Sequence, residues 1–209
     1  MIFGPQQKIV FIGDSITDAN RRGTDAPYGS GYVSMVRNLI LARYPELKLT
    51  FVNRGVGGDT TRNLADRWEQ DVVAAHPDWL SVKIGINDVW RAFGNNVHEA
   101  VPLPEYTTTL RELLTRARAA TGTRLILMEP YMIEPNRANR MRAEMDRFGA
   151  AVRQLAQEFD AVLVRTQAAF DAVLEHTTPR DWAEDQIHPN APGHAVIALA
   201  FLRAVGFEL

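Results

Sequence analysis

The sequence predicts an α/β fold in which a parallel sheet lies between two layers of helices. Five short runs rich in Val, Ile, Leu and Phe alternate along the 209-residue chain with longer segments of helical periodicity. The runs carry few polar residues, which is typical of parallel strands covered on both faces. Because the connections between parallel strands are right-handed, helices are expected on both sides of the sheet. We therefore expect a three-layer α/β/α sandwich.

The expected strands and helices follow one another without a break. The strands are Lys8–Ile12, Leu47–Val52, Leu80–Ile84, Arg124–Met128 and Ala161–Val164. Two helical segments have clear apolar faces, formed by Tyr32, Val33, Val36, Leu39 and Ile40 in the first and by Met141, Met145, Phe148, Val152, Leu155 and Phe159 in the second. Pro104 and Pro192 stand where the first turn of a helix tolerates proline. No linker, repeat or second core is visible, so residues 1–209 are expected to form a single domain.

The composition is that of an ordinary soluble protein and excludes several functions. Hydrophobic residues make up 46% of the chain, and the formal net charge is −2. Basic residues are scattered among acidic ones, so neither a nucleic acid nor an anionic membrane is an expected partner. The absence of cysteine excludes disulfides and thiolate chemistry. The start of the chain does not resemble a signal peptide and no apolar run approaches about 20 residues, so we expect a cytoplasmic protein.

The segments that follow the expected strands are small, polar and rich in glycine. They are Gly13–Asp14–Ser15, the stretch from Asn53 to Thr60, Gly85–Ile86–Asn87–Asp88, and Glu129–Pro130–Tyr131. In open α/β sheets, ligands bind beyond the carboxyl ends of the strands. The functional site is therefore expected where these segments meet.

Ser15 is the candidate nucleophile, because it directly follows the first expected strand in the run GDSIT. A serine becomes a useful nucleophile only when a base takes its proton and donors stabilise the resulting oxyanion. The alternative is a serine that caps a helix. The G-x-S-x-G elbow of α/β-hydrolases is absent, so that family is not indicated.

Asp185 and His188 form a candidate acid–base pair near the end of the chain. Their three-residue spacing places both side chains on one side of a turn, where the carboxylate can accept from Nδ1–H and leave Nε2 free as a base. The alternative is a local hydrogen bond that fixes a loop. A metal site that adds His194 is less favoured, since His194 fits the pattern of the last helix.

Gly58 and Asn87 follow the second and third strands and are candidate oxyanion donors. Glycine lets a backbone N–H approach a substrate closely, and the asparagine amide is a neutral donor. Together with the Ser15 N–H, they can form an oxyanion hole of three hydrogen-bond donors. Taken singly, both are ordinary turn residues. The run NRGVGGDT matches neither phosphate-binding glycine motif in its spacing.

Four blocks together resemble the SGNH branch of the GDSL hydrolases, a serine hydrolase superfamily. They are Gly13–Asp14–Ser15, Gly58 with the preceding Asn53 and Gly55, Gly85–Ile86–Asn87–Asp88, and Asp185–Gln186–Ile187–His188–Pro189. The resemblance covers nearly the whole chain and implies a flavodoxin-like, mostly five-stranded parallel sheet. It implies a catalytic triad of Ser15, Asp185 and His188, and an oxyanion hole of Ser15, Gly58 and Asn87. It implies no metal and no organic cofactor.

Within this superfamily the chain most resembles cytoplasmic acetylxylan esterases, in the runs FIGDSITD, IGINDVWR, TQAAF and FLRAVGFE. The resemblance implies removal of short acyl groups, above all acetyl, from a carbohydrate such as acetylated xylo-oligosaccharide. It also implies a homo-oligomer, since those enzymes form ring-like octamers. One departure is Glu184, which precedes Asp185 where that group has tryptophan. The alternatives are a lipolytic esterase, lysophospholipase or thioesterase with the same triad, and a non-catalytic carbohydrate- or phosphate-binding domain.

Two further expectations concern side chains around the site. Tyr32, Trp90 and Tyr131 are candidate substrate contacts because aromatic rings can stack on a sugar, although ordinary core packing is the alternative, and Asp14 is added to this group. Lys83 is a charged residue inside the expected central strand and needs a partner if it is buried. We expect an ion pair with Glu129 at the end of the neighbouring strand.

Overall fold

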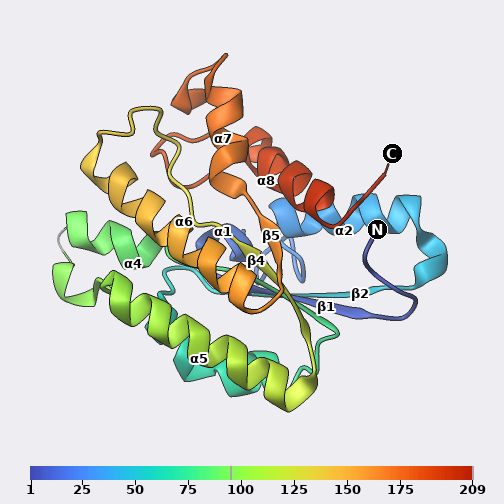
Figure 1. The fold of residues 1–209 in the computed structure, drawn as a ribbon. Helices are drawn as coiled ribbons and strands as arrows, with labels where there is room; N and C mark the ends of the chain where they lie inside the picture. The colour runs from blue at the N-terminus through green and yellow to red at the C-terminus, as the bar shows by residue number, and fades with distance from the viewer. Residues whose placement is uncertain (95, 209) are drawn as a thin grey trace.

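The computed structural model describes residues 1–94 and 96–208 and contains a sheet of five parallel strands in the order β2-β1-β3-β4-β5. The strands are β1 (Lys8–Gly13), β2 (Thr50–Gly55), β3 (Trp79–Lys83), β4 (Arg124–Met128) and β5 (Val162–Val164). Figure 1 shows α5 and α6 on one side of this sheet and α2 and α8 on the other. The predicted three-layer α/β/α sandwich is confirmed.

The first six helices connect consecutive strands, the last two follow the final strand, and the helices pack in two groups. They are α1 (Ser15–Asp18), α2 (Tyr32–Arg43), α3 (Thr61–Trp68), α4 (Ile86–Trp90), α5 (Leu103–Thr121), α6 (Arg140–Glu158), α7 (Thr166–Leu174) and α8 (Ala191–Ala204), with short helical turns η1 (Pro45–Leu47), η2 (Glu69–Val73), η3 (Arg91–Phe93), η4 (Val97–Glu99) and η5 (Pro179–Asp181). α8 packs against α2 and α7, whereas α5 packs against α3 and α6. Among the described residues, none of these helices has the length and apolarity needed to cross a membrane.

The second strand begins later than the sequence predicts. Pro45–Leu47 forms the helical turn η1, and Lys48 takes a left-handed conformation with φ 48°, so the chain becomes extended only at Thr50. The strand then continues through Asn53 to Gly55, which pairs with Gly13. Leu39 also departs from the prediction, since it is exposed on α2 while the other four predicted residues of that face are buried.

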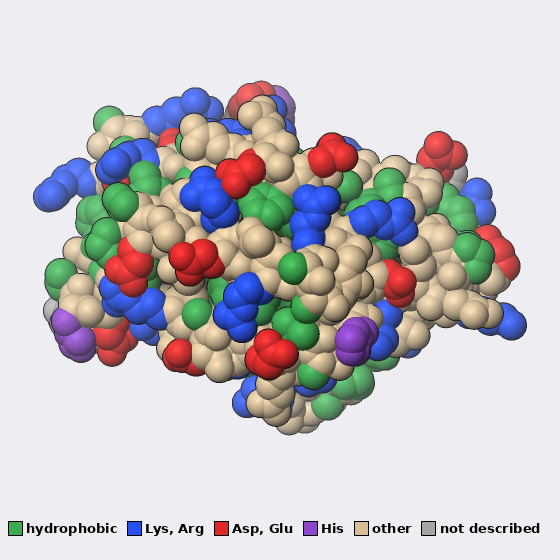
Figure 2. Space-filling model, turned by 60° about the horizontal axis from the view of Figure 1, so that its bottom comes forward, with side chains coloured by type: hydrophobic (Ala, Val, Ile, Leu, Met, Phe, Trp, Pro, Cys, Tyr) green, Lys and Arg blue, Asp and Glu red, His purple; other side chains and the backbone are tan. Residues whose placement is uncertain are grey.

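The buried apolar residues form a continuous core that includes side chains from all five strands. Phe11 of β1 contacts Phe201 of α8 with ring centroids 5.2 Å apart, which ties the first strand to the last helix. The two ends of the chain also meet, because the Ile2 N–H donates to the Val205 carbonyl at 2.9 Å. On the face shown in Figure 2, acidic and basic side chains are interspersed.

Gly13 allows β1 and β3 to end side by side. A Cβ at this position would collide with the Lys83 carbonyl and the Thr17 hydroxyl. Glycine is therefore required where the first strand leaves the sheet, one step before Asp14 and Ser15. This close approach fixes where the chain enters α1.

The predicted Lys83–Glu129 ion pair is wrong. Val82 pairs with Leu127, so Lys83 lies level with Met128, and Glu129, one residue further on, points to the opposite face of the sheet. There Glu129 accepts from Arg153 of α6 at 2.6 Å. The Lys83 ammonium lies instead 3.9 Å from the Asp14 carboxylate and 4.8 Å from the centre of the Tyr131 ring.

The Lys83–Asp14 pair is fully buried, and each charge depends on the other. Burial lowers the pKa of Lys83, while the Asp14 carboxylate acts to raise it. Asp14 Oδ1 accepts from the Ile16 N–H at 3.0 Å, but Oδ2 has no hydrogen-bond partner in the described part of the chain. Removal of one partner of such a pair leaves an uncompensated buried charge.

We predict that Lys83→Met lowers the free energy of unfolding by about 3–5 kcal/mol, because it leaves Asp14 buried without a counter-charge. Urea unfolding followed by circular dichroism measures this loss. Lys48→Met is the matched control, since Lys48 is exposed in the turn after η1, and should change stability by less than about 0.5 kcal/mol. Equal effects of the two substitutions would show that the buried pair carries no special stabilisation.

Candidate active site

Ser15 is the first residue of α1, at the carboxyl end of β1. Asp14 caps this short helix with extended backbone angles, and its side chain accepts from the Ile16 N–H. The capping role that the sequence left open for Ser15 therefore belongs to Asp14. The Ser15 hydroxyl is free to face the loop that precedes α8.

That loop carries Asp185 and His188 and is closed by a bridge between Ala183 and Pro189. Asp185 Oδ1 accepts from the N–H groups of Ile187 at 3.0 Å and His188 at 2.7 Å. The carboxylate thus fixes the backbone of the turn on which the histidine stands. Three-residue spacing places the two side chains together, as the sequence predicts.

The three side chains form a continuous hydrogen-bonded line. Ser15 Oγ lies 3.0 Å from His188 Nε2, and His188 Nδ1 lies 2.7 Å from Asp185 Oδ2. Burial acts to raise the pKa of Asp185, but the hydrogen bonds from His188 and Ile187 outweigh it and lower the pKa below its usual value. The carboxylate therefore stays ionised and holds the proton of the imidazole on Nδ1, which leaves Nε2 to accept from Ser15.

Tyr131 anchors this loop from below. Its hydroxyl donates to the Ile187 carbonyl at 3.3 Å, and the Ile187 side chain is buried. The N–H of Ile133 also donates to the Gln186 carbonyl at 2.9 Å. The segment after β4 therefore fixes the position of the loop that carries His188 relative to the sheet.

The loop after β2 brings Gly58 to the same place. Gly58 has φ +84°, a left-handed conformation that glycine adopts without strain. Its carbonyl accepts from Arg91 Nη2 at 2.6 Å, and Arg91 is held in turn by Glu99 at 2.7 Å. Within the described chain, neither the Gly58 N–H nor the Ser15 N–H donates to another backbone group.

Asn87 lies in the first turn of α4 with one amide hydrogen already in use. Its Nδ2 donates to the Asp59 carbonyl at 2.9 Å. Because an amide nitrogen carries two hydrogens, the second one remains available to a ligand, and the first bond fixes its direction. Gly58, Asn87 and Trp90 line one cavity of about 320 Å³ together with Arg91, Gly94 and Asn96.

Asn53, Arg67 and Arg91 support the site in ways that the sequence motifs alone do not reveal. The Asn53 amide donates to the carbonyls of Thr17 and Tyr28 at 2.7 and 2.8 Å, which ties β2 to the segment after Ser15. Arg67 bridges the Asp59 carboxylate at 2.7 Å and the Gly13 carbonyl at 3.1 Å. A polar residue inside a strand pattern could have pointed to a supporting role for Asn53, but no local pattern indicates such a role for the two arginines.

Three of the four predicted substrate contacts are wrong. The side chains of Asp14, Tyr32 and Tyr131 have no exposed surface, because they pack beneath the site rather than line it. Tyr32 donates its backbone N–H to His194 Nδ1 at 3.2 Å and bonds the Thr17 hydroxyl through its own hydroxyl. Trp90 alone is accessible, with 39% of its surface exposed and its ring 5.9 Å from that of His188.

His194 belongs to the buried structure behind the site. Burial and the nearby Lys83 ammonium lower its pKa to about 4, so the ring is neutral and accepts the Tyr32 N–H. The prediction of a structural His194 is therefore favoured over the metal site that would join it to Asp185 and His188.

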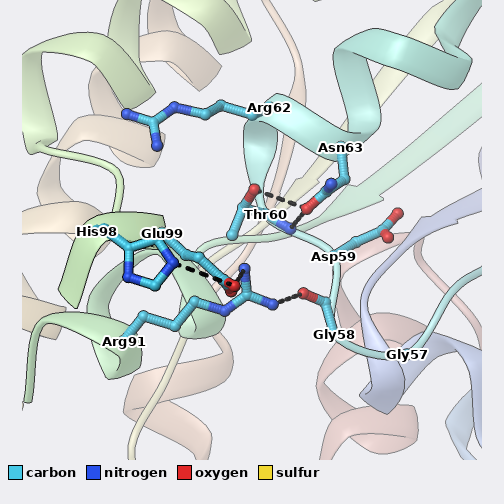
Figure 3. Close-up of a pocket in the computed structure, with 9 residues that line it drawn as sticks. All are labelled: Gly57, Gly58, Asp59, Thr60, Arg62, Asn63, Arg91, His98 and Glu99. Carbon is cyan, nitrogen blue, oxygen red and sulfur yellow. Dashed lines mark hydrogen bonds and ion pairs between the residues drawn. The ribbon is translucent and has the colours of Figure 1, made fainter. Parts of the chain in front are cut away.

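A second and more polar cavity of about 470 Å³ adjoins the Gly58 loop (Figure 3). It is lined by Gly57, Gly58, Asp59, Thr60, Arg62, Asn63, Arg91, His98 and Glu99. A Cβ at Gly57 would lie 3.9 Å from the Ser15 Cβ, so the cavity begins directly beside the serine. Three nearby apolar side chains stay out of both cavities, since Val101 is buried, while Phe93 and Val97 are exposed and line neither of them.

Asp88 links the loop after β2 to α4. Its Oδ1 accepts from both the N–H and the hydroxyl of Thr61, at 3.0 and 2.5 Å, while Oδ2 has no partner among the described residues. Burial raises the pKa of Asp88 to about 6, although the Thr61 hydrogen bonds oppose the shift. The folded protein therefore holds this proton more tightly than the unfolded chain does.

We predict that the Asp88 contribution to stability is complete below about pH 4 and is lost as the pH rises through about 6, because ionisation is less favourable in the folded state. A rise of about two pKa units corresponds to about 3 kcal/mol. In Asp88→Asn this part of the pH dependence should disappear. Urea unfolding at pH 4, 5, 6 and 7 measures it, and parallel curves for variant and wild type would contradict the assignment.

The family to which the chain belongs follows from comparison with known proteins. A sequence model of the GDSL-like Lipase/Acylhydrolase family matches residues 11–196. The chain is 45% identical to the acetylxylan esterase of Geobacillus stearothermophilus over 100% of its own length and 98% of that protein. It is 27% identical to the thioesterase 1/protease 1/lysophospholipase L1 of Escherichia coli (strain K12), over 91% of this chain and 79% of that one.

Solved structures agree with this assignment. The crystal structure of the Geobacillus stearothermophilus acetylxylan esterase superposes with a TM-score of 0.96 at 45% identity, covering 100% of this chain and 98% of that one. An alpha/beta hydrolase enzyme from the metagenome of Lake Arreo, Spain, superposes with a TM-score of 0.94 at 45% identity, covering 99% and 98%. The sequence-based resemblance is confirmed: the chain belongs to the GDSL-like lipase/acylhydrolase family.

Proposed function

We propose that this carboxylic ester hydrolase removes acetyl groups from a carbohydrate, with Ser15 as nucleophile, His188 as general base and Asp185 as the residue that orients the histidine. The observation that carries the proposal is the hydrogen-bonded line from Ser15 Oγ through both nitrogens of His188 to Asp185. A binding protein has no need of a serine aligned with a base in this way.

The reaction proceeds in two halves. Ser15 Oγ attacks the ester carbonyl while its proton passes to His188 Nε2. The oxyanion that forms accepts from the N–H groups of Ser15 and Gly58 and from the free amide hydrogen of Asn87. The alcohol then leaves with the proton from His188, and Ser15 retains the acyl group. In the second half, water gives its proton to His188, attacks the acyl carbonyl and releases the acid.

The acyl group is short because the described residues of the site form no apolar channel. Of the side chains that line the cavity at Gly58 and Asn87, only that of Trp90 is large and apolar. Each methylene of a longer acyl chain would contribute about 0.8 kcal/mol to binding only if an apolar surface buried it. The acetylxylan esterase at 45% identity supports acetyl as the acyl group and a xylo-oligosaccharide as its carrier.

We also propose that residues 1–209 form one domain that assembles as a homo-oligomer in the cytoplasm. The continuous core supports the single domain. An exposed apolar hollow of about 450 Å³ between α7 and α8, with Val173, Trp182 and Leu199 in its lining, supports association of chains. The resemblance to cytoplasmic acetylxylan esterases supports the location and the ring-like octamer.

We predict that Ser15→Ala and His188→Ala each lower kcat by about 10³-fold or more, and that the double variant is little worse than either, because the pair acts as a unit. Hydrolysis of 4-nitrophenyl acetate measures all four forms. Unchanged circular dichroism spectra provide the control for folding. Losses that multiply in the double variant would contradict the assignment of nucleophile and base.

We predict that kcat/KM on 4-nitrophenyl esters is highest for acetate and falls as the acyl chain grows, since the described side chains beside Ser15 form no apolar groove for the added methylenes. The series acetate, butyrate, hexanoate and octanoate measures this preference. A maximum at octanoate would overturn the deacetylase proposal in favour of a lipolytic enzyme or thioesterase and would leave the triad untouched.

A further inference from the structure

The polar cavity of Figure 3 is suited to a sugar rather than to an acyl group, and its position makes it part of the substrate site. It shares Gly58 and Arg91 with the cavity that contains Asn87 and Trp90. Gly57 lies at its edge, where an added Cβ would be 3.9 Å from the Ser15 Cβ. A substrate whose carbonyl lies at Ser15 therefore meets this cavity within one sugar unit.

The Asn63 amide offers hydrogen bonds from a fixed position, whereas His98 offers an exposed imidazole whose Nε2 lies 3.8 Å from Glu99 Oε1. The Asn63 side chain is held by its oxygen, which accepts from the Thr60 N–H at 3.0 Å and from the Thr60 hydroxyl at 2.9 Å. Its Nδ2 donates to no group in residues 1–94 and 96–208, so both of its hydrogens are available. Figure 3 shows Arg62 on one side of the opening and Arg91 with His98 on the other.

The charges of the cavity are already balanced within the protein. Arg62 makes a bidentate pair with Glu105 at 2.5 and 2.7 Å, Arg91 pairs with Glu99 at 2.7 Å, and Asp59 pairs with Arg67 at 2.7 Å. A phosphate or carboxylate ligand would meet cations whose charge is already neutralised by a carboxylate of the protein. A neutral ligand with many hydroxyl groups can instead bond to guanidinium, amide and carboxylate edges without displacing any charge.

The size of the cavity fits such a ligand. About 470 Å³ lies within the range of about 300–1,000 Å³ that is usual for small-molecule sites. The accessible Trp90 ring in the adjoining cavity provides an apolar surface on which a sugar ring can lie. None of the described side chains that line the polar cavity is apolar.

We propose that the cavity between Asn63 and His98 is a subsite for the uncharged sugar units that neighbour the acetylated one, and that it selects oligosaccharide esters over small esters. This inference rests on the proposed function, since it assumes that the ester is cleaved at Ser15. It adds that Asn63 and His98 bind the sugar hydroxyls, while the acetyl group itself never reaches them.

The test compares acetylated xylotriose with 4-nitrophenyl acetate in wild type, Asn63→Ala, His98→Ala and the double variant. The ratio of kcat/KM for the sugar ester to that for the small ester should fall about three- to tenfold in each single variant, as expected for one lost neutral hydrogen bond. It should fall about 10- to 100-fold in the double variant. Asn38→Ala, an exposed asparagine on α2, is the matched control and should leave the ratio unchanged.

A second measurement uses binding without chemistry. Unacetylated xylotriose should inhibit hydrolysis of 4-nitrophenyl acetate, and its inhibition constant should rise in the double variant by the same factor as the ratio falls. Inorganic phosphate, tested as the anionic alternative, should inhibit more weakly than xylotriose. Stronger inhibition by phosphate would overturn the assignment to a neutral sugar.

The remaining outcomes separate the subsite from the proposed function. A ratio that stays constant in the double variant, or a proportional loss on both substrates, would contradict the subsite alone. A wild-type enzyme that hydrolyses 4-nitrophenyl acetate but no acetylated sugar would contradict the carbohydrate substrate and the subsite together.

Discussion

The hydrogen bond between Ser15 and His188 joins residues that lie 173 positions apart, and the rest of the fold serves to hold that one distance. Ser15 leaves the sheet at the end of β1, next to its centre, and His188 stands on a loop that precedes the last helix. Packing of Phe11 on Phe201 fixes β1 against α8, and Tyr131 supports the loop from the end of β4. Each of these contacts is buried, so the Ser15 and His188 side chains meet on a well-packed base.

The same region carries more buried charge than a core normally tolerates. Asp14, next to Ser15, and Lys83 form a buried pair, and buried Asp88 bonds to Thr61 at the start of α3. Such groups are costly to bury, and they persist at functional sites where they fix the backbone. Asp14 caps the helix that begins with Ser15, and Asp88 holds the start of α3 against α4. Stability and the geometry of the site are therefore coupled through these carboxylates.

The sequence predicts the layers of the fold and the blocks that meet at the site, because strand patterns and motifs are local. It does not predict which side chains from different strands contact one another on each face of the sheet. Lys83 is paired with Asp14 rather than Glu129. The register between β3 and β4 decides which of their side chains share a face of the sheet, and it places Lys83 and Glu129 on opposite faces. Tyr32 and Tyr131 flank the motifs in sequence, yet they are buried beneath the site. Arg91 supports Gly58 through a tertiary hydrogen bond that the spacing of residues in the sequence does not predict.

In the proposed reaction, Ser15 Oγ is the atom that receives the acyl group. Reaction with a fluorophosphonate, which phosphonylates an activated serine, followed by peptide mass spectrometry tests it most directly. We expect one adduct per chain, on the peptide that contains Ser15, and a much lower rate of labelling in His188→Ala. Labelling of another serine, or equal labelling of Ser15 in wild type and His188→Ala, would contradict it.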